Sequence, residues 1–226
     1  MVLLTDDERE IYNLIKEFLK KKSFITITEI LDFLSYRLKF NPTVNRSKIE
    51  IILKNLMKKK YIFPRTKLVR DNILEVPLRR EIYQHIKRNP GININEIMRD
   101  LNIGSNQVLW HLKFLEKFQF IRFMRIQNQK AFFKFELDNS NDKTYFYLRK
   151  EKIKKIIKLL ENEKEALSCT KISNRLKFHY NTSKKYLEIL SNLNLIKIAR
   201  NDDNDNNYFI LNSKNYYNIL KSLSKS

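Results

Sequence analysis

Apolar residues recur at every third or fourth position through most of the chain, a period that predicts amphipathic helices. The helices come in groups of three. Each group is followed by two short segments rich in β-branched and aromatic residues, which predict a small hairpin. The first group comprises a helix from Thr5, where Thr5 and Glu8 form a capping box, a second from near Thr28, a third over residues 46–59, and strands at 61–63 and 67–69.

The same plan follows twice more along the chain. The second group comprises helices from Pro77 to the break at residues 89–91, at 95–101 and at 105–118, with strands at 121–126 and 131–137. The third group comprises helices at 145–160, 170–176 and 181–193, strands at 195–199 and 208–211, and a last helix at 213–223. Apolar residues fall at matching places in the three groups, so we expect three repeated units, at residues 1–75, 76–140 and 141–226.

Charge and glycine content restrict the function. The 226 residues include 45 Lys and Arg against 25 Asp and Glu, a net charge of +20, and none of the three units is acidic. Such an excess favours a polyanion as partner, and duplex DNA is the expected one. Two glycines are too few for the Gly-rich phosphate loops of dinucleotide or P-loop enzymes. We therefore expect a protein that is not an enzyme.

Other classes of site receive no support from the sequence. The lone Cys169 forms no internal disulfide, which fits a reducing cytoplasm, and the three histidines are scattered, so we expect neither a metal nor a cofactor. The acidic loop at 201–207 lacks the Gly and Glu positions of a calcium loop and is interpreted as a turn. No export signal and no apolar run long enough to cross a bilayer is found, so membrane insertion is not expected.

Three helices followed by a hairpin form the plan of a winged helix-turn-helix, in which the third helix enters the major groove. Residues 89–97, 101–103 and 107–115 resemble archaeal winged-helix transcription regulators related to the arsenic-responsive and antibiotic-resistance repressors. The resemblance covers about 60 residues of the second unit. Residues 180–187 and 195–196 are similar to another archaeal winged-helix group, and the first unit resembles the family in pattern alone. The fold class that this implies is mainly α with small β-hairpin wings, in three tandem winged-helix units.

The resemblance also implies which side chains face DNA, because the family reads its operator from the start of the third helix. In the second and third units these positions are Ser105, Asn106, Gln107, Trp110, His111, Tyr180, Thr182, Lys184 and Lys185. Lys113 joins them because helical geometry places it with Asn106 and Trp110, opposite the apolar stripe. Arg46 and Lys48 begin the third helix of the first unit. Asn and Gln suit adenine edges, and lysines suit phosphates.

The predicted hairpins and Trp110 leave alternatives open. Arg122, Arg125 and Lys130 on the second hairpin either enter a narrow minor groove or stay solvated. Trp110 either faces DNA, anchors a protein interface, where tryptophan is enriched, or folds back onto the wing.

The resulting hypothesis is a cytoplasmic, nucleoid-associated transcription regulator that binds double-stranded DNA. One alternative is a tandem winged-helix scaffold for protein partners, of the kind found in the endosomal-sorting complex and in RNA polymerase accessory subunits; Ile51 and Trp110 on outer helix faces favour it. A nonspecific nucleic-acid binder is the other. The last helix carries an apolar stripe of Tyr216, Ile219, Leu220 and Leu223, which either docks on its own unit or forms a homodimer.

Overall fold

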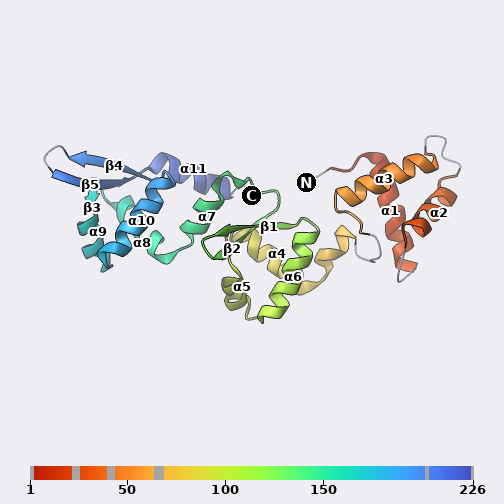
Figure 1. The fold of residues 1–226 in the computed structure, drawn as a ribbon, viewed down its shortest axis with the longest axis horizontal. Helices are drawn as coiled ribbons and strands as arrows, with labels where there is room; N and C mark the ends of the chain where they lie inside the picture. The colour runs from red at the N-terminus through yellow and green to blue at the C-terminus, as the bar shows by residue number, and fades with distance from the viewer. Residues whose placement is uncertain (1–2, 22–25, 40–43, 64–68, 202–203, 225–226) are drawn as a thin grey trace. The chain divides into compact units, whose positions relative to one another are not determined.

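The computed structural model describes residues 3–21, 26–39, 44–63, 69–201 and 204–224, and it is mainly α-helical with small antiparallel strand pairs (Figure 1). This confirms the expected class of a mainly α protein with small β-hairpins. The helices are α1 (Asp6–Lys21), α2 (Ile27–Arg37), α3 (Arg46–Lys58), α4 (Pro77–Arg88), α5 (Ile94–Leu101), α6 (Ser105–Lys117), α7 (Asp142–Leu148), α8 (Glu151–Asn162), α9 (Cys169–Leu176), α10 (Tyr180–Asn192) and α11 (Ser213–Ser224), with 3₁₀ turns η1 (Arg70–Glu75) and η2 (Asn139–Asn141). The strands are β1 (Ile121–Ile126), β2 (Gln129–Lys134), β3 (Leu167–Ser168), β4 (Ile196–Asn201) and β5 (Asn204–Leu211).

Helices α1, α2 and α3 enclose one apolar core, in which Ile15, Leu34 and Leu56 are fully buried. The expected capping box opens α1, since the Thr5 amide donates to Glu8 Oε2 at 2.9 Å and the Glu8 amide donates to Thr5 Oγ1 at 3.3 Å. Helix α2 begins one residue earlier than expected, because Thr26 forms a second capping box with Glu29.

The segment after α3 differs from the hairpin that the sequence predicts. Ile62 pairs with Val69 in an isolated antiparallel bridge, and the linking residues 64–66 and most of the expected strand at 67–69 lie outside the described residues. The 3₁₀ turn η1 follows, which the apolar pattern did not predict. Its Arg70 is buried, with its guanidinium carbon 5.4 Å from the centre of the Tyr61 ring and 4.8 Å from that of Phe120.

Helices α4, α5 and α6 and the hairpin β1–β2 follow at close to the expected positions. The hairpin turn is shorter than expected, with two residues, Gln127 and Asn128, between the strands in place of four. Gln127 adopts a positive φ of 54°, which two-residue hairpin turns of the right twist require. The second strand therefore begins at Gln129 and ends at Lys134, before the expected end at residue 137.

The expected helix at 145–160 is two helices, and this part of the prediction was wrong. Helix α7 ends at Leu148, and α8 begins at Glu151 after Lys150, whose backbone is extended (φ −73°, ψ 124°). An apolar period that continues across such a break hides it from pattern analysis. The short strand β3 was also not anticipated; it pairs with β5, which pairs in turn with β4 from Ile196↔Leu211 to Asn201↔Asn204.

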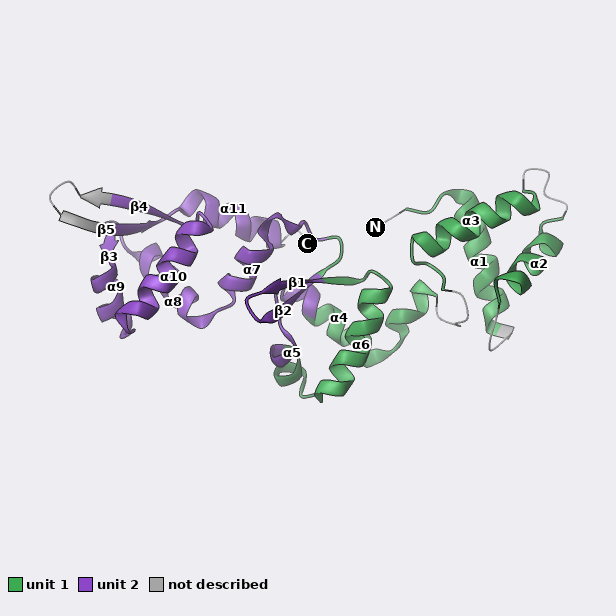
Figure 2. Cartoon of the chain, in the orientation of Figure 1, with its two compact units in different colours: residues 1–85, 97–122, 134–136 green, residues 86–96, 123–133, 137–226 purple. Residues whose placement is uncertain are grey.

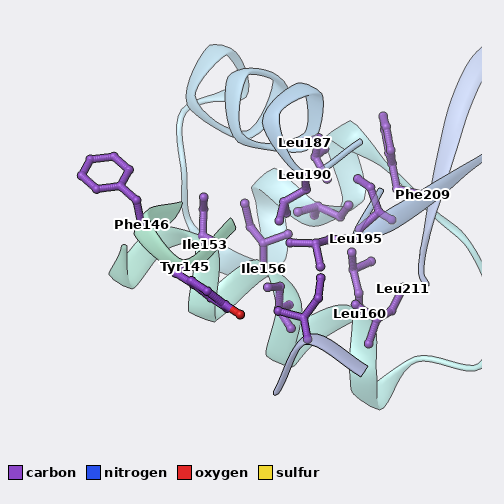
Figure 3. Packing of buried hydrophobic residues seen from close by; sticks show 14 of the residues in the cluster. Tyr145, Phe146, Ile153, Ile156, Leu160, Leu187, Leu190, Leu195, Phe209 and Leu211 are labelled. Carbon is purple, nitrogen blue, oxygen red and sulfur yellow. The ribbon is translucent and has the colours of Figure 1, made fainter. Parts of the chain in front are cut away.

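A second core lies beneath these elements (Figure 3). Ile153, Ile156 and Leu160 of α8 face Leu187 and Leu190 of α10 there, with Leu195, Phe209 and Leu211 beside them. Helix α11 adds Ile219 to this core, with Tyr216 and Leu223 packed against it. The stripe on the last helix is therefore docked on its own unit, while Leu220 stays 37% exposed.

Two compact units emerge from the packing of the chain (Figure 2). One contains residues 1–85, 97–122 and 134–136, and the other contains residues 86–96, 123–133 and 137–226. The expected boundary at residue 75 falls between η1 and α4, whereas the one at residue 140 falls inside η2. The three tandem units stay a prediction.

Candidate nucleic-acid interface

The turn between α5 and α6 is built from local polar contacts. Asn93 and Glu96 cap α5 reciprocally, since the Glu96 amide donates to Asn93 Oδ1 and the Asn93 amide donates to Glu96 Oε2, both at 3.0 Å. The chain then reverses at Asn102, whose φ of 51° lies in the left-handed region that Asn tolerates. Gly104 is the extended N-cap of α6. The Ile103 amide donates to the Met98 carbonyl at 3.1 Å, which closes the turn between α5 and α6.

Helix α6 has one buried, mainly apolar side and one side open to solvent. Val108, Leu112 and Leu115 are at most 2% exposed. The exposed side carries Ser105, Asn106, Gln107, Leu109, Trp110 and Lys113. Five of the expected DNA-facing residues of this helix therefore lie together on its solvent side, and they begin in its first turn, where a helix presents residues to base edges.

His111 does not belong to this set, and its expected position facing DNA was wrong. Its side chain is 6% exposed, and its Nδ1 is buried without a hydrogen-bond partner in the described part of the chain. Burial lowers the pKa of the imidazole, and the nearby Arg79 lowers it further. At about 100° per residue, His111 lies about 60° from Val108 and about 40° from Leu115 in helical projection, which turns it toward the interior.

Trp110 packs against neighbouring side chains, and about half of its surface stays exposed to solvent. Its ring meets His111 edge-on at 4.8 Å between ring centres and Phe114 at 4.7 Å. The guanidinium carbon of Arg79, from α4, lies 5.1 Å from the Trp110 ring centre. Even so, 52% of the tryptophan is exposed. The described contacts of its ring come from α4 and α6 and not from the hairpin.

Arg79 is the residue near this surface that the sequence analysis missed. A signal for it was present: Arg79 and Arg80 stand in the first turn of α4, where the helix dipole disfavours positive charge. Two arginines in the first turn of a helix indicate that their side chains are there for contacts outside the helix and not for its stability.

The three cations expected on the hairpin β1–β2 differ in their exposure to solvent. Arg125 is exposed, and Arg122 and Lys130 are half-buried. Lys130 Nζ lies 4.0 Å from the centre of the Phe123 ring, a cation–π contact that holds the ammonium beside the strand. At the turn, Gln127 donates to the Tyr147 hydroxyl at 3.3 Å.

Helix α10 presents the candidates of the third unit. Tyr180, Lys184 and Lys185 are exposed and Thr182 is half-buried. Tyr180 and Lys184 line a groove of about 530 Å³ together with Glu188 and Tyr208. Cys169 also lines it, and burial raises the pKa of this thiol. Glu188 places a carboxylate beside Lys184 in the lining of the groove. The positive charge that α10 presents outside the groove therefore comes from Lys185.

The two candidates near the N-terminal end of α3, Arg46 and Lys48, each form an ion pair with a carboxylate. Arg46 Nη1 lies 3.1 Å from Asp32 Oδ1, and Lys48 Nζ lies 2.6 Å from Asp7 Oδ2. A phosphate would have to replace these partners, although exposed ion pairs of this kind are weak. Ile51 on the same helix is 58% exposed.

A search of the described ranges finds no cluster of three or more His, Cys, Asp or Glu side chains able to hold a metal ion. Among the helices in these ranges, none combines the length and the apolar character that crossing a bilayer requires.

Comparison with known proteins gives a family for the central part of the chain. Residues 77–144 match the model of a family of N-terminal HTH domains. Over 210 residues the chain is 30% identical to an uncharacterized HTH-type transcriptional regulator of Methanocaldococcus jannaschii, a match that covers 90% of this chain and 53% of that protein. The chain thus spans about half the length of this relative.

The matched range runs from the start of α4 through α5, α6 and the hairpin into α7. It contains the residues that carried the resemblance to archaeal regulators, and the relative is archaeal, so that expectation is confirmed. The relationship also supports a protein that is not an enzyme. Residues 77–144 are thus similar to N-terminal HTH domains, and 90% of the chain is similar to an archaeal HTH-type transcriptional regulator, of which it spans 53%.

Proposed function

We propose that the chain binds double-stranded DNA through residues 77–144, with α6 as the recognition helix in the major groove, and that it regulates transcription. One observation carries the proposal: the exposed polar turn Ser105, Asn106 and Gln107 begins a helix whose opposite side, at Val108, Leu112 and Leu115, is buried. Asn and Gln at such positions pair with adenine through two hydrogen bonds, and Lys113 about two turns later reaches a phosphate.

The hairpin supplies a further contact in this proposal. Arg125 is exposed on β1 and Lys130 lies near the start of β2, and both are proposed to contact the DNA backbone or minor groove. Arg122 is the third cation of this wing. The net charge of +20 supplies the general attraction to phosphate.

Helix α10 is proposed as a second contact. Lys184 and Lys185 would anchor phosphates, with Tyr180 and Thr182 at the helix start. The first unit contributes less, because Arg46 and Lys48 already pair with Asp32 and Asp7. Three tandem winged units, double-stranded DNA as the ligand and association with the nucleoid all belong to this proposal.

A homodimer through α11 would need a surface other than the predicted stripe. Tyr216, Ile219 and Leu223 are engaged in the core of their own unit, and Tyr217 and Leu220 are what the helix leaves exposed. A dimer interface formed by Tyr217 and Leu220 would bury little area. We therefore propose that a single chain makes all of the DNA contacts.

The scaffold alternative has one observation in its favour, the exposed apolar side chains Ile51, Leu109 and Trp110. Mapping the positions of the protein on the genome of its source, followed by gel shifts on the enriched duplexes, separates the two functions. A regulator gives a few discrete sites that bind the purified chain tightly. A scaffold gives no enrichment beyond that of its protein partners and no shift of the isolated duplex.

A further inference from the structure

A buried cation lies directly behind the exposed surface of α6. Arg79 is 2% exposed and is among the largest fully buried side chains of the described residues. It stands in the first turn of α4, and its Nη1 donates to the carbonyl oxygen of Ile73 at 3.0 Å. Its Nε is buried without a hydrogen-bond partner.

Arg79 also lacks an ion-pair partner in the part of the chain that the structure describes. No carboxylate within these ranges forms a salt bridge with it, and burial alone accounts for the lowered pKa of its guanidinium. Aromatic faces take the place of a carboxylate, since the guanidinium carbon lies 5.1 Å from the Trp110 ring centre and 4.6 Å from that of Phe114.

Burying an unpaired charge is costly, and apolar side chains of similar volume often serve a core better. A cation–π pair with tryptophan is the strongest of its kind and offsets part of that cost when water is excluded. The arrangement is therefore poorly explained by folding stability. It is explained by its effect on the position of Trp110, whose ring is in contact with Arg79, His111 and Phe114.

Trp110 is held by these contacts and still has about half of its surface exposed to solvent. Trp110 is 52% exposed and its neighbour Leu109 is 49% exposed. Asn106 lies one helical turn before Trp110, and Gln107 lies three residues before it, so both share its side of the helix. The outer side of α6 thus combines adenine-type hydrogen-bonding groups with a fixed apolar ring.

This combination matches an A·T pair in the major groove, where adenine offers an acceptor and a donor and thymine offers a methyl group. We propose that Trp110 contacts the 5-methyl group of thymine, and that Arg79 is the positioning residue that fixes the indole for this contact. The inference rests on the proposed function, since it requires α6 to lie in the major groove.

The test replaces thymine by uracil in a duplex that binds the wild-type chain, one position at a time. Uracil lacks only the methyl group, so hydrogen bonding is preserved. At the contacted position, the wild-type chain should lose at least about fivefold in affinity, the range of one good base contact. Trp110→Ala should bind the thymine and uracil duplexes equally, because the partner of the methyl group is gone.

Arg79→Lys should behave like Trp110→Ala in this comparison. Lysine keeps the positive charge and reaches the Ile73 carbonyl, but it has no planar group to stack on the indole. Arg80→Lys is the matched control: Arg80 Nε donates to the Leu74 carbonyl at 2.7 Å, and Arg80 contacts neither Trp110 nor Phe114 in the described contacts. It should keep the wild-type preference for thymine.

A second measurement reads the position of the indole without DNA. Trp110 is the single tryptophan of the chain, so its fluorescence reports this place alone. Acrylamide quenching should rise in Arg79→Lys and stay at the wild-type level in Arg80→Lys, with circular dichroism unchanged in both.

Three results would overturn the inference. If the wild-type chain binds a duplex but no thymine-to-uracil change lowers its affinity, Trp110 does not read a methyl group, and the proposed function still stands. If Arg79→Lys keeps both the thymine preference and the wild-type quenching, Arg79 does not position the ring. If the wild-type chain binds no duplex, the proposed function fails together with the inference.

Discussion

Gly91 lies so close to the backbone of Phe146 that a Cβ atom on it would come within 2.8 Å of the Phe146 Cα. The φ of Gly91 is +83°, which L side chains rarely adopt, and its amide donates to the Phe132 carbonyl at 2.8 Å. Through this glycine the segment after α4 meets α7 and the strand β2.

We predict that Gly91→Ala destabilises the chain by more than about 1 kcal/mol, since a non-glycine residue here is strained and also meets backbone atoms that cannot move aside. Gly104→Ala is the control, because nothing lies within 4 Å of its Cβ position and its φ of −71° suits any residue. Urea unfolding of the two variants measures the difference. Equal stability of Gly91→Ala and the wild type would show that the contact with Phe146 is absent in solution.

The buried His111 predicts a loss of stability in acid. Burial lowers the pKa of its imidazole in the folded chain, so the unfolded chain takes up the proton first as the pH falls. Its contribution is complete above about pH 6.5, the ordinary histidine value, and decreases below it until the folded pKa is reached. Thermal unfolding at about pH 7.5 and pH 5.5 should show a smaller decrease for His111→Gln than for the wild type.

His85 serves as the comparison for this effect. It is half-buried, and its Nε2 lies 3.2 Å from Asp100 Oδ2. His85→Gln should not reduce the acid loss. An acid loss that survives in His111→Gln and disappears in His85→Gln would contradict the burial of His111.

Replacement of Gln107 and Lys185 separates base reading from phosphate anchoring. Gln107→Ala should cost about 1 to 3 kcal/mol of binding free energy on the preferred duplex and nearly nothing on a random one. Lys185→Ala should weaken binding to both duplexes alike and lower the salt slope by about one. Fluorescence anisotropy with both duplexes measures the two effects. Equal losses for Gln107→Ala on the two duplexes would show that it does not read bases.

Helix α11 is expected to act as part of its unit and not as a dimerisation element. Its Ser222 hydroxyl lies 3.0 Å from the Tyr145 hydroxyl, and Ile219 is 6% exposed. Ile219→Asp should therefore lower the free energy of unfolding by several kcal/mol, as an unpaired charge in a core does. Leu220→Asp, on the exposed side, should leave stability near that of the wild type.

Light scattering completes this test. The full chain should be a monomer at concentrations of tens of micromolar, and a chain ending at residue 212 should be less stable, with no change of oligomeric state. A full-length dimer that Leu220→Asp dissociates would instead establish the homodimer through α11.

Much of the fold follows from apolar periodicity and local capping signals. The capping pair Thr5 and Glu8, the helix from Ser105 and the strand from Ile121 all lie where the sequence predicts them. The break between α7 and α8 was missed because Ile153 and Ile156 continue the period of Tyr145. The turn at Gln127 was missed because a positive φ at glutamine has no sequence signal.

The candidate interface was harder to predict than the fold. Periodicity correctly separates Val108 from Asn106, but the resemblance to the family implied a DNA-facing His111, which the packing of its neighbours buries. Those neighbours include Arg79, which comes from another helix 32 residues earlier. The one sequence signal for this packing is the pair of arginines in the first turn of α4, and it does not say which helix they contact.

The salt dependence of duplex binding tests the central claim most directly. The claim is that a chain of net charge +20 binds double-stranded DNA, so binding should release counterions from the phosphates that its lysines and arginines neutralise. About six phosphate contacts would lower the affinity by about 10³-fold between roughly 50 and 200 mM salt. The account predicts a gel shift at low salt that weakens with this slope. No shift of any genomic duplex by micromolar protein at low salt would contradict it.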